Sequence, residues 1–212
     1  MQIPGNLVHA KGNQDALQSL LEHKAIQRLA GFANSMLYHY SPKVVFPAAT
    51  FNFGPTVVTL DHTDNLNFAS GMCSITALGD YDPTMGGHLI LFDLGLIVQF
   101  PPGSTIIIPS AILRHGNVPI ASGEKRQSFT QYFAGGLIRW VDYGFQTEAN
   151  FKRESPELWL AAMHGRQNRV EEAAGYFPKL KTCVRIQVLK FDTLWNHFNY
   201  SNQLNALRHT RT

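Results

Sequence analysis

The spacing of hydrophobic residues changes along the chain, and the first change falls near residue 42. Over residues 13–40, apolar side chains recur at steps of three and four, which is typical of an amphipathic helix. Asn13 suits the cap position at its start. Pro42 predicts its end, because the residue before a proline disfavours helical torsions. We therefore expect an N-terminal helical segment over residues 1–43.

Residues 44–146 consist of short β-rich runs with no helical pattern between them. Turn residues separate the runs, as at Gly79-Asp80, Gly86-Gly87 and Pro101-Pro102-Gly103. Closely spaced strands without intervening helices favour a sandwich or jelly roll over a βαβ fold. The expected strands cover residues 44–46, 56–60, 72–78, 88–93, 96–100, 105–108 and 126–134.

After Phe145 the helical spacing returns. Ser155-Pro156-Glu157 predicts a helix start, with a capping hydroxyl, a proline at the first helical position and an acid in the first turn. We expect a basic C-terminal helical region over residues 147–212. The predicted fold class is therefore mainly β with flanking helices. A double-stranded β-helix (jelly-roll) core would occupy residues 44–146, between an N-terminal helix and a C-terminal helical tail.

The composition describes a globular chain. It has 212 residues, of which 44% are hydrophobic and 16% charged, enough to bury a sizeable core. No apolar run is long enough to span a bilayer, and the N-terminus lacks a signal-peptide pattern, so we expect no membrane partner. Cys73 and Cys183 provide neither a disulfide framework nor zinc-ligand spacing, which favours a reducing, intracellular compartment.

Charge is distributed unevenly. Residues 1–150 hold 8 Lys and Arg against 10 Asp and Glu, whereas residues 151–212 hold 10 against 5, a net charge of +5. A basic tail is compatible with a nucleic-acid surface and equally with a solvated helical face, so charge alone decides nothing.

His62 and Asp64 follow the apolar run 56–60 directly. Alternate side chains of an extended chain share a face, so these two would point the same way. They could occupy neighbouring positions on a metal ion. A second histidine would then complete the two-histidine, one-carboxylate face that is typical of non-haem Fe(II) oxygenases. In a chain with nine histidines, the pair alone is a weak signal.

His115 is the best candidate for the third ligand. It follows Asp64 by 51 residues, and four strand-like runs fit in between. In a jelly roll, that count would return the chain to the strand where the site began. His88 is the main rival, but only one strand-like run separates it from Asp64, so we interpret it as a hairpin residue that could still have an accessory pocket role.

Arg126 and Ser128 lie on the strand that follows His115. Alternation puts both on one face with Thr130 and Tyr132, which we expect to be the barrel interior. A buried guanidinium needs an anionic partner, and its planar fork matches a carboxylate. A dicarboxylate co-substrate such as 2-oxoglutarate, chelating the metal at one end, would meet this need. An internal Asp or Glu is the alternative partner.

Together these features resemble the Fe(II)- and 2-oxoglutarate-dependent dioxygenases, and specifically the TET/J-binding-protein group, which oxidises methylated bases in DNA. The resemblance covers residues 57–145, and the run 128–140 is most similar to the fungal branch. It is carried by His62-Thr63-Asp64, Gly86-Gly87-His88-Leu89, Phe100-Pro101-Pro102-Gly103-Ser104, Ile108-Pro109-Ser110, His115-Gly116-Asn117, Arg126-Gln127-Ser128 and Arg139-Trp140.

The resemblance implies that His62, Asp64 and His115 form the catalytic centre by holding Fe(II). It implies that Arg126 and Ser128 bind the distal carboxylate of 2-oxoglutarate. The two cofactors implied are therefore Fe(II) and 2-oxoglutarate.

The resemblance also places Asn67 and Tyr132 beside the target base, where each could alternatively be a scaffold residue. One position departs from the animal enzymes, because Ala134 stands where they have a cytosine-contacting histidine. This departure leaves room for a methylated base other than 5-methylcytosine.

The implied activity is oxidation of 5-methylcytosine in DNA to 5-hydroxymethylcytosine and further products, in the nucleus. The alternatives are an N6-methyladenine demethylase of the same family, a 2-oxoglutarate oxygenase of a protein or small molecule, and a non-catalytic DNA-binding relative. Zinc hydrolysis also suits two histidines and a carboxylate, but it leaves Arg126 and Ser128 without a role.

Overall fold

The computed structural model describes residues 11–40, 46–165, 168 and 189–190, and the chain divides into two compact units, Met1–Phe46 and Pro47–Thr212. The first unit contains a 3-10 helix, Lys11–Asn13, and the helices α1 (Gln14–Glu22) and α2 (Lys24–Tyr40). The prediction of one continuous helix over residues 13–40 is wrong, because the helix is interrupted at His23. His23 has an extended backbone, and its Nδ1 accepts a hydrogen bond from the N–H of Ala25 at the start of α2.

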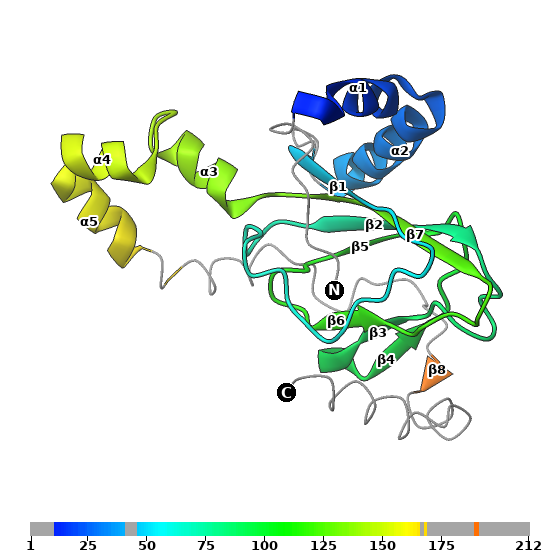
Figure 1. The fold of residues 1–212 in the computed structure, drawn as a ribbon. Coiled ribbons are helices and arrows are strands. Elements are labelled where there is room, and N and C mark those ends of the chain that lie inside the picture. The colour runs from blue at the N-terminus through cyan, green and yellow to red at the C-terminus, as the bar shows by residue number, and fades with distance from the viewer. Residues whose placement is uncertain (1–10, 41–45, 166–167, 169–188, 191–212) are drawn as a thin grey trace, which may run out of the picture. The chain divides into compact units, whose positions relative to one another are not determined.

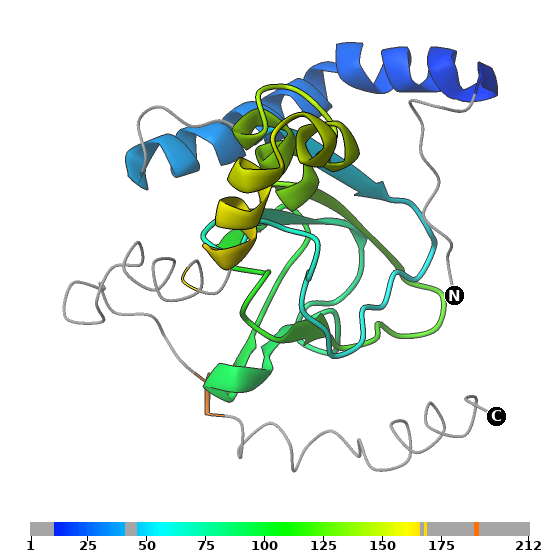
Figure 2. The ribbon, with the colours of Figure 1, turned by 90° about the vertical axis from the view of Figure 1, so that its left-hand side faces the viewer.

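The second unit is built on two four-stranded antiparallel sheets, which form separate layers (Figures 1 and 2). One sheet has the order β1-β7-β2-β5 and the other the order β6-β3-β4-β8. The strands of the first sheet are β1 (Ala48–Asn52), β2 (Cys73–Asp80), β5 (Thr105–Ile108) and β7 (Lys125–Tyr132). Those of the second are β3 (Leu89–Leu91), β4 (Leu96–Val98), β6 (His115–Asn117) and β8 (Leu189–Lys190).

The chain crosses repeatedly from one sheet to the other, and this crossing is the winding of a jelly roll. The chain passes from β2 in the first sheet to β3 and β4 in the second, then to β5, back to β6 and finally to β7. Closing two sheets in this way covers most strand edges, which is how such folds avoid edge-to-edge association. The prediction of a mainly β fold with flanking helices and a jelly-roll core is confirmed.

Residues 55–67, here called the connecting segment, complete the second sheet without being a regular strand. His62 and His115 exchange two backbone hydrogen bonds of 3.1 and 2.9 Å, and the N–H of Asn117 donates to Thr59 O at 2.9 Å. The N–H of Thr59 is bound by the side-chain Oδ1 of Asn117 at 2.8 Å instead of by a backbone carbonyl. The segment therefore pairs with β6, but the regular strand that was expected over residues 56–60 does not form.

The irregularity is a bulge. Three steps along the chain from Thr59 to His62 lie opposite two steps from Asn117 to His115, so the connecting segment holds one extra residue. A bulge re-aims the side chains that follow it, and such features are common beside active sites. Gly116 allows the close approach, because a Cβ atom there would lie 2.9 Å from Thr59 O.

The core lies between the two sheets. It contains Ala77 of β2, Leu89 and Leu91 of β3, Phe100 after β4, and Ile108 of β5. Ala77 lies directly opposite Ser128 in the β2–β7 register, so both face this core. Because side chains alternate along a strand, Arg126 shares that face, as the sequence predicted.

Three strands, β1, β6 and β8, were not predicted, and β8 lies in the region 147–212 that was expected to be helical. β1 contains two alanines and an asparagine, which have weak strand preference, and it forms because it pairs with β7. β6 has only three residues, one of them glycine. The expected strand over residues 44–46 falls partly outside the described residues, and Phe46 is not in a strand.

Three helices follow β7 in the described part of the chain. They are α3 (Gly135–Asp142), α4 (Glu148–Glu154) and α5 (Pro156–His164), so helical structure begins earlier than the expected position after Phe145. The predicted start of α5 at Pro156 is correct, although no side chain caps it. Most of the basic region 166–212 lies outside the described residues, as does Cys183, so the three-part division of the chain stays a prediction. No helix among the described residues is long and apolar enough to cross a membrane.

Candidate metal centre and anion pocket

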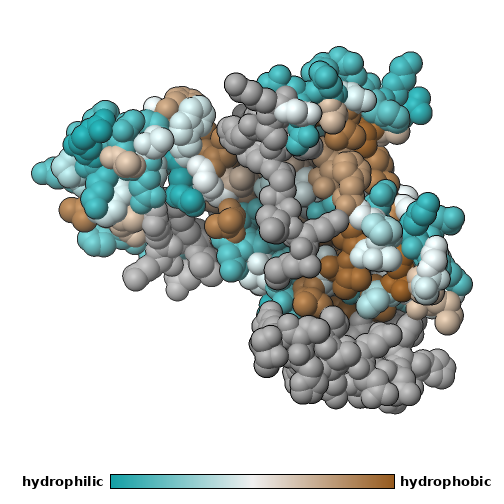
Figure 3. Space-filling view, in the orientation of Figure 1, coloured by the Kyte–Doolittle hydropathy of each residue, from teal (hydrophilic) through white to brown (hydrophobic). Residues whose placement is uncertain are grey.

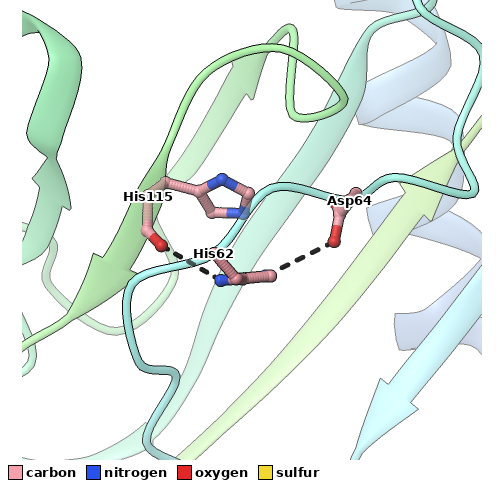
Figure 4. Close-up of side chains that lie close together, drawn as sticks. All are labelled: His62, Asp64 and His115. Carbon is pink, nitrogen blue, oxygen red and sulfur yellow. Dashed lines mark hydrogen bonds and ion pairs between the residues drawn. The ribbon is translucent and has the colours of Figure 1, made fainter.

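His62, Asp64 and His115 come together at the junction of the connecting segment and β6 (Figure 4). One ligand atom from each lies within 4.8 Å of the others. The Nε2 atom of His62 is 3.4 Å from Oδ1 of Asp64, and the two imidazole rings are 4.3 Å apart between centroids. The structure therefore groups the three residues that the sequence selected, and it leaves the rival His88 outside the cluster.

Backbone carbonyls orient both imidazoles. Nδ1 of His62 lies 2.8 Å from Leu60 O and 3.0 Å from His115 O. Nδ1 of His115 lies 2.9 Å from Leu113 O. A carbonyl oxygen only accepts, so each Nδ1 carries a proton, and Nε2 is the nitrogen of each ring that can bind a metal. This is the arrangement by which ligating histidines are usually held.

The carboxylate of Asp64 is held from the other side. Its backbone N–H donates to Ser110 O at 2.9 Å. The side-chain amide of Asn67 donates to Oδ2 at 3.2 Å, while Oδ1 faces His62. Asp64 can therefore offer Oδ1 to a metal while Oδ2 stays hydrogen-bonded to the protein.

The protonation tendencies of the three groups differ. The hydrogen bond with Asp64 is the largest influence on His62 and raises the pKa of its imidazole. Burial raises the pKa of Asp64, but hydrogen bonds from His62 and Ser110 outweigh it and the net pKa is lowered. Burial lowers the pKa of His115. A metal ion would therefore displace the proton that His62 shares with Asp64, and binding would weaken as the pH falls.

One side of the cluster is open to solvent. The side chains of His62 and Asp64 are 35% and 30% exposed, whereas His115 is 4% exposed. Three ligands on one face with an accessible opposite side are what a metal needs in order to bind exogenous molecules.

Cys73 lies close to the carboxylate of Asp64, but its thiol does not suit metal binding. Burial is the main reason that the pKa of its thiol is raised to about 12, while a hydrogen bond with Ser110 acts in the opposite direction. The group therefore stays protonated, and the thiolate is the form that binds metals.

Arg126 lies at the start of β7 and is 3% exposed. Its guanidinium donates to Val57 O at 3.2 Å and interacts with the hydroxyl of Tyr81. Its Nε has no hydrogen-bond partner among the described residues. Burial lowers the pKa of Arg126 and Tyr81 raises it, and no carboxylate contributes to the balance. Within the part of the chain that the structure describes, no internal Asp or Glu thus pairs with this buried cation.

Ser128 lies two residues further along the same face of β7. Its Oγ accepts a hydrogen bond from Asn52 at 2.9 Å and keeps its own proton to donate. This face of β7 therefore offers one guanidinium and one hydroxyl donor.

Asn67 and Tyr132, the expected substrate contacts, are both half-buried. The Tyr132 hydroxyl accepts from Thr50 Oγ1 at 3.2 Å. Asn67 pairs by its backbone with Ala134, the position that departs from the animal enzymes. The structure thus places Asn67 near the metal cluster, with its amide already bound to Asp64.

Sequence reasoning missed two polar residues of this region. Tyr81 contacts Arg126 and also donates to Phe100 O, and it follows β2 directly with no motif to mark it. Ser110 belongs to a motif that contributed to the family resemblance, but nothing in its spacing indicated a bond to Asp64.

Comparisons with known proteins do not assign the chain to a family. No protein-family profile and no curated protein matches it. Among solved structures it is similar to NgTET1 in complex with 5mC DNA, with 18% identity and a TM-score of 0.40 over 55% of this chain and 53% of that one. The match thus spans about half the length of NgTET1.

Two structures of the viral collagen prolyl hydroxylase vCPH from Paramecium Bursaria Chlorella virus-1 are similar to the same extent. The 2OG complex is 17% identical, with a TM-score of 0.38 over 53% of this chain and 74% of that one. A truncated form is 18% identical, with a TM-score of 0.39 over 53% and 71%. At these levels neither the family nor the function follows from the comparisons, so a functional proposal rests on the side chains of the site.

The cluster predicts selective loss of metal binding on substitution. His115→Ala should weaken Co(II) binding by more than about 100-fold, since even indirect supports of metal ligands contribute about 10–100-fold. His62→Ala, at a half-exposed position, should do the same. His164→Ala removes an exposed histidine of α5 and should leave Co(II) affinity unchanged. Titration by calorimetry measures the three affinities, and tight Co(II) binding by folded His115→Ala would contradict the assignment.

Proposed function

We propose that the protein is an Fe(II)- and 2-oxoglutarate-dependent dioxygenase of the TET/J-binding-protein group. His62, Asp64 and His115 would hold the iron, and Arg126 with Ser128 would hold the co-substrate. The observation that carries the proposal is the pairing of two features in one jelly roll: a two-histidine, one-carboxylate cluster and a buried arginine that no carboxylate of the described residues pairs with.

The donor set fits Fe(II). Two imidazole nitrogens and one carboxylate oxygen on one face are the ligands of non-haem iron oxygenases. When bound, Fe(II) with 2-oxoglutarate and oxygen supplies the oxidant for inserting one oxygen atom into a C–H bond, while 2-oxoglutarate is converted to succinate and carbon dioxide. Ligands already oriented by hydrogen bonds to Leu60, Leu113 and Asn67 would need little rearrangement to bind the ion.

The inward face of β7 fits a distal carboxylate. The unused Nε of Arg126 and the free proton of Ser128 are donors, and a carboxylate is acceptor-only. Charge-assisted bonds of this kind are strong in a buried site. Tyr81 would position the guanidinium through its hydroxyl. A zinc hydrolase would leave these donors without a ligand.

Arg126→Met should raise the apparent KM for 2-oxoglutarate by roughly 10–100-fold, because a hydrogen bond to a charged group contributes about 1.5–3 kcal/mol. Lys125→Met is the matched control, since Lys125 is exposed and precedes Arg126 on β7. Succinate release at varied 2-oxoglutarate concentration measures both. An equal effect of the two substitutions, or none, would show that Arg126 does not bind the co-substrate.

For the substrate we propose a methylated base in DNA, with 5-methylcytosine first and N6-methyladenine as the alternative that Ala134 allows. The support is the resemblance of the motifs around His62, Asn67 and Tyr132 to this group, together with the likeness of the run 128–140 to its fungal branch. Nuclear localisation would follow from this substrate. A base inside a duplex would have to be flipped out to reach the cluster.

A specific observation favours a second candidate, an oxygenase of a protein or small molecule. Residues 46–165 hold 6 Lys and Arg against 10 Asp and Glu, a net charge of −4. Leu66, beside the cluster, is 84% exposed, and hydrophobic residues gather over the β-sheets in the face that Figure 3 shows. Phosphate contacts would therefore come mainly from the basic region 151–212, whose net charge is +5.

A substrate panel separates the two candidates. Succinate release and product mass are measured with Fe(II) and 2-oxoglutarate on duplexes carrying 5-methylcytosine, N6-methyladenine or no methyl group, and on a collagen-like proline peptide. The DNA proposal predicts turnover of a methylated duplex only, with an affinity that falls steeply as salt rises. Turnover of the peptide alone, at a salt-independent rate, would replace it by the second candidate.

A further inference from the structure

We infer that Asn67 and Ser110 are positioning residues that hold Asp64 as a one-oxygen ligand for the metal. The inference rests on the proposed metal site and deepens it. It gives Asn67 a role at the metal instead of the substrate contact that the sequence resemblance implies.

The amide of Asn67 uses both of its N–H donors inside the protein. Its Nδ2 donates to Asp64 Oδ2 at 3.2 Å and to Ser110 Oγ at 3.1 Å. The reverse orientation of the amide would aim its oxygen at a carboxylate oxygen, which is repulsive, so the two acceptors fix which way Asn67 points. Only the carbonyl oxygen of Asn67 is then left for a substrate.

Ser110 lies between β5 and β6 and hydrogen-bonds the same carboxylate. It is 1% exposed, its backbone O accepts from Asp64 N at 2.9 Å, and its side chain also hydrogen-bonds Asp64. A buried hydroxyl committed in this way has little freedom to move. Asp64 is therefore bound at its backbone and at its side chain by one residue.

The loop that carries Asn67 is itself fastened to the end of β7. The N–H of Gly135 donates to Leu66 O at 2.8 Å, and the N–H of Phe68 donates to Phe133 O at 2.8 Å. Gly135 permits this approach, because a Cβ atom there would lie 2.9 Å from Leu66 O. Asn67, which donates to Asp64, is thus held in place by backbone hydrogen bonds of its two chain neighbours, Leu66 and Phe68.

These contacts set the coordination mode of Asp64. Turning the side chain to chelate through both oxygens would strain or break the bond between Asn67 and Oδ2, whereas Oδ1 already lies on the side of His62. One oxygen on the metal leaves more positions open for other ligands than two would. Asn67 and Ser110 thereby preserve the open face of the cluster.

The test compares metal binding by five forms of the full chain: wild type, Asn67→Leu, Ser110→Ala, Ser110→Thr and Asn65→Leu. Asn67→Leu removes both donors at similar size, and Ser110→Ala removes the hydroxyl, whereas Ser110→Thr retains it. Asn65→Leu is the matched control, because Asn65 is exposed in the same loop and bonds only Thr63 among the described contacts of its side chain.

Co(II) affinity and the visible absorption spectrum of bound Co(II) are the readouts, with the unfolding midpoint measured alongside. We expect Asn67→Leu and Ser110→Ala to weaken Co(II) binding by about 10–100-fold and to change the spectrum, as losses of such supports do. Asn65→Leu and Ser110→Thr should keep the wild-type spectrum.

The opposite results are distinguishable. Wild-type Co(II) affinity in folded Asn67→Leu and Ser110→Ala, with only the KM for substrate raised, would overturn the positioning role and leave the metal site standing. A wild-type chain that binds no Co(II) would overturn both the role and the proposed function.

Discussion

The hydrogen bonding of the connecting segment, residues 55–67, is the constraint on which the rest of the site depends. At one end it pairs with Arg126, whose backbone N–H donates to Pro55 O at 2.8 Å and whose O accepts from Val57. In its middle it pairs with His115, and at its far end Asn67 pairs with Ala134. One irregular stretch thus connects the arginine, both histidines and the carboxylate, which come from three different parts of the chain.

Electrostatics divide this site into two halves with opposite needs. In the candidate metal cluster, the charged groups already have partners. His62 lies against Asp64, and Asp64 also accepts hydrogen bonds from Asn67 and Ser110. At Arg126 the cation is buried against a carbonyl and a phenol, and no carboxylate from residues 11–40 or 46–165 pairs with it. A buried charge without a counterion is costly, so the fold keeps there a site that an anionic ligand would stabilise.

The fold class and the grouping of the three candidate metal ligands were predictable from the sequence, because both depend on patterns that act locally. Alternation along an extended chain placed His62 beside Asp64 and Arg126 beside Ser128, and strand counting returned the chain to His115. The bulge before His62 and the strands β1 and β6 were not predictable, since they form through pairing with distant partners such as Asn117. Ser110 and Tyr81 were missed for the same reason: their roles exist only in contact with Asp64 and Arg126.

The central claim is that the histidine cluster and Arg126 form a single site for a metal and a dicarboxylate. Calorimetric titration of 2-oxoglutarate, without oxygen and with or without Co(II), tests it most directly. The account predicts that Co(II) strengthens 2-oxoglutarate binding and that 2-oxoglutarate strengthens Co(II) binding by the same factor, as linkage requires for two ligands of one site. Metal and 2-oxoglutarate affinities that are independent of each other would contradict it.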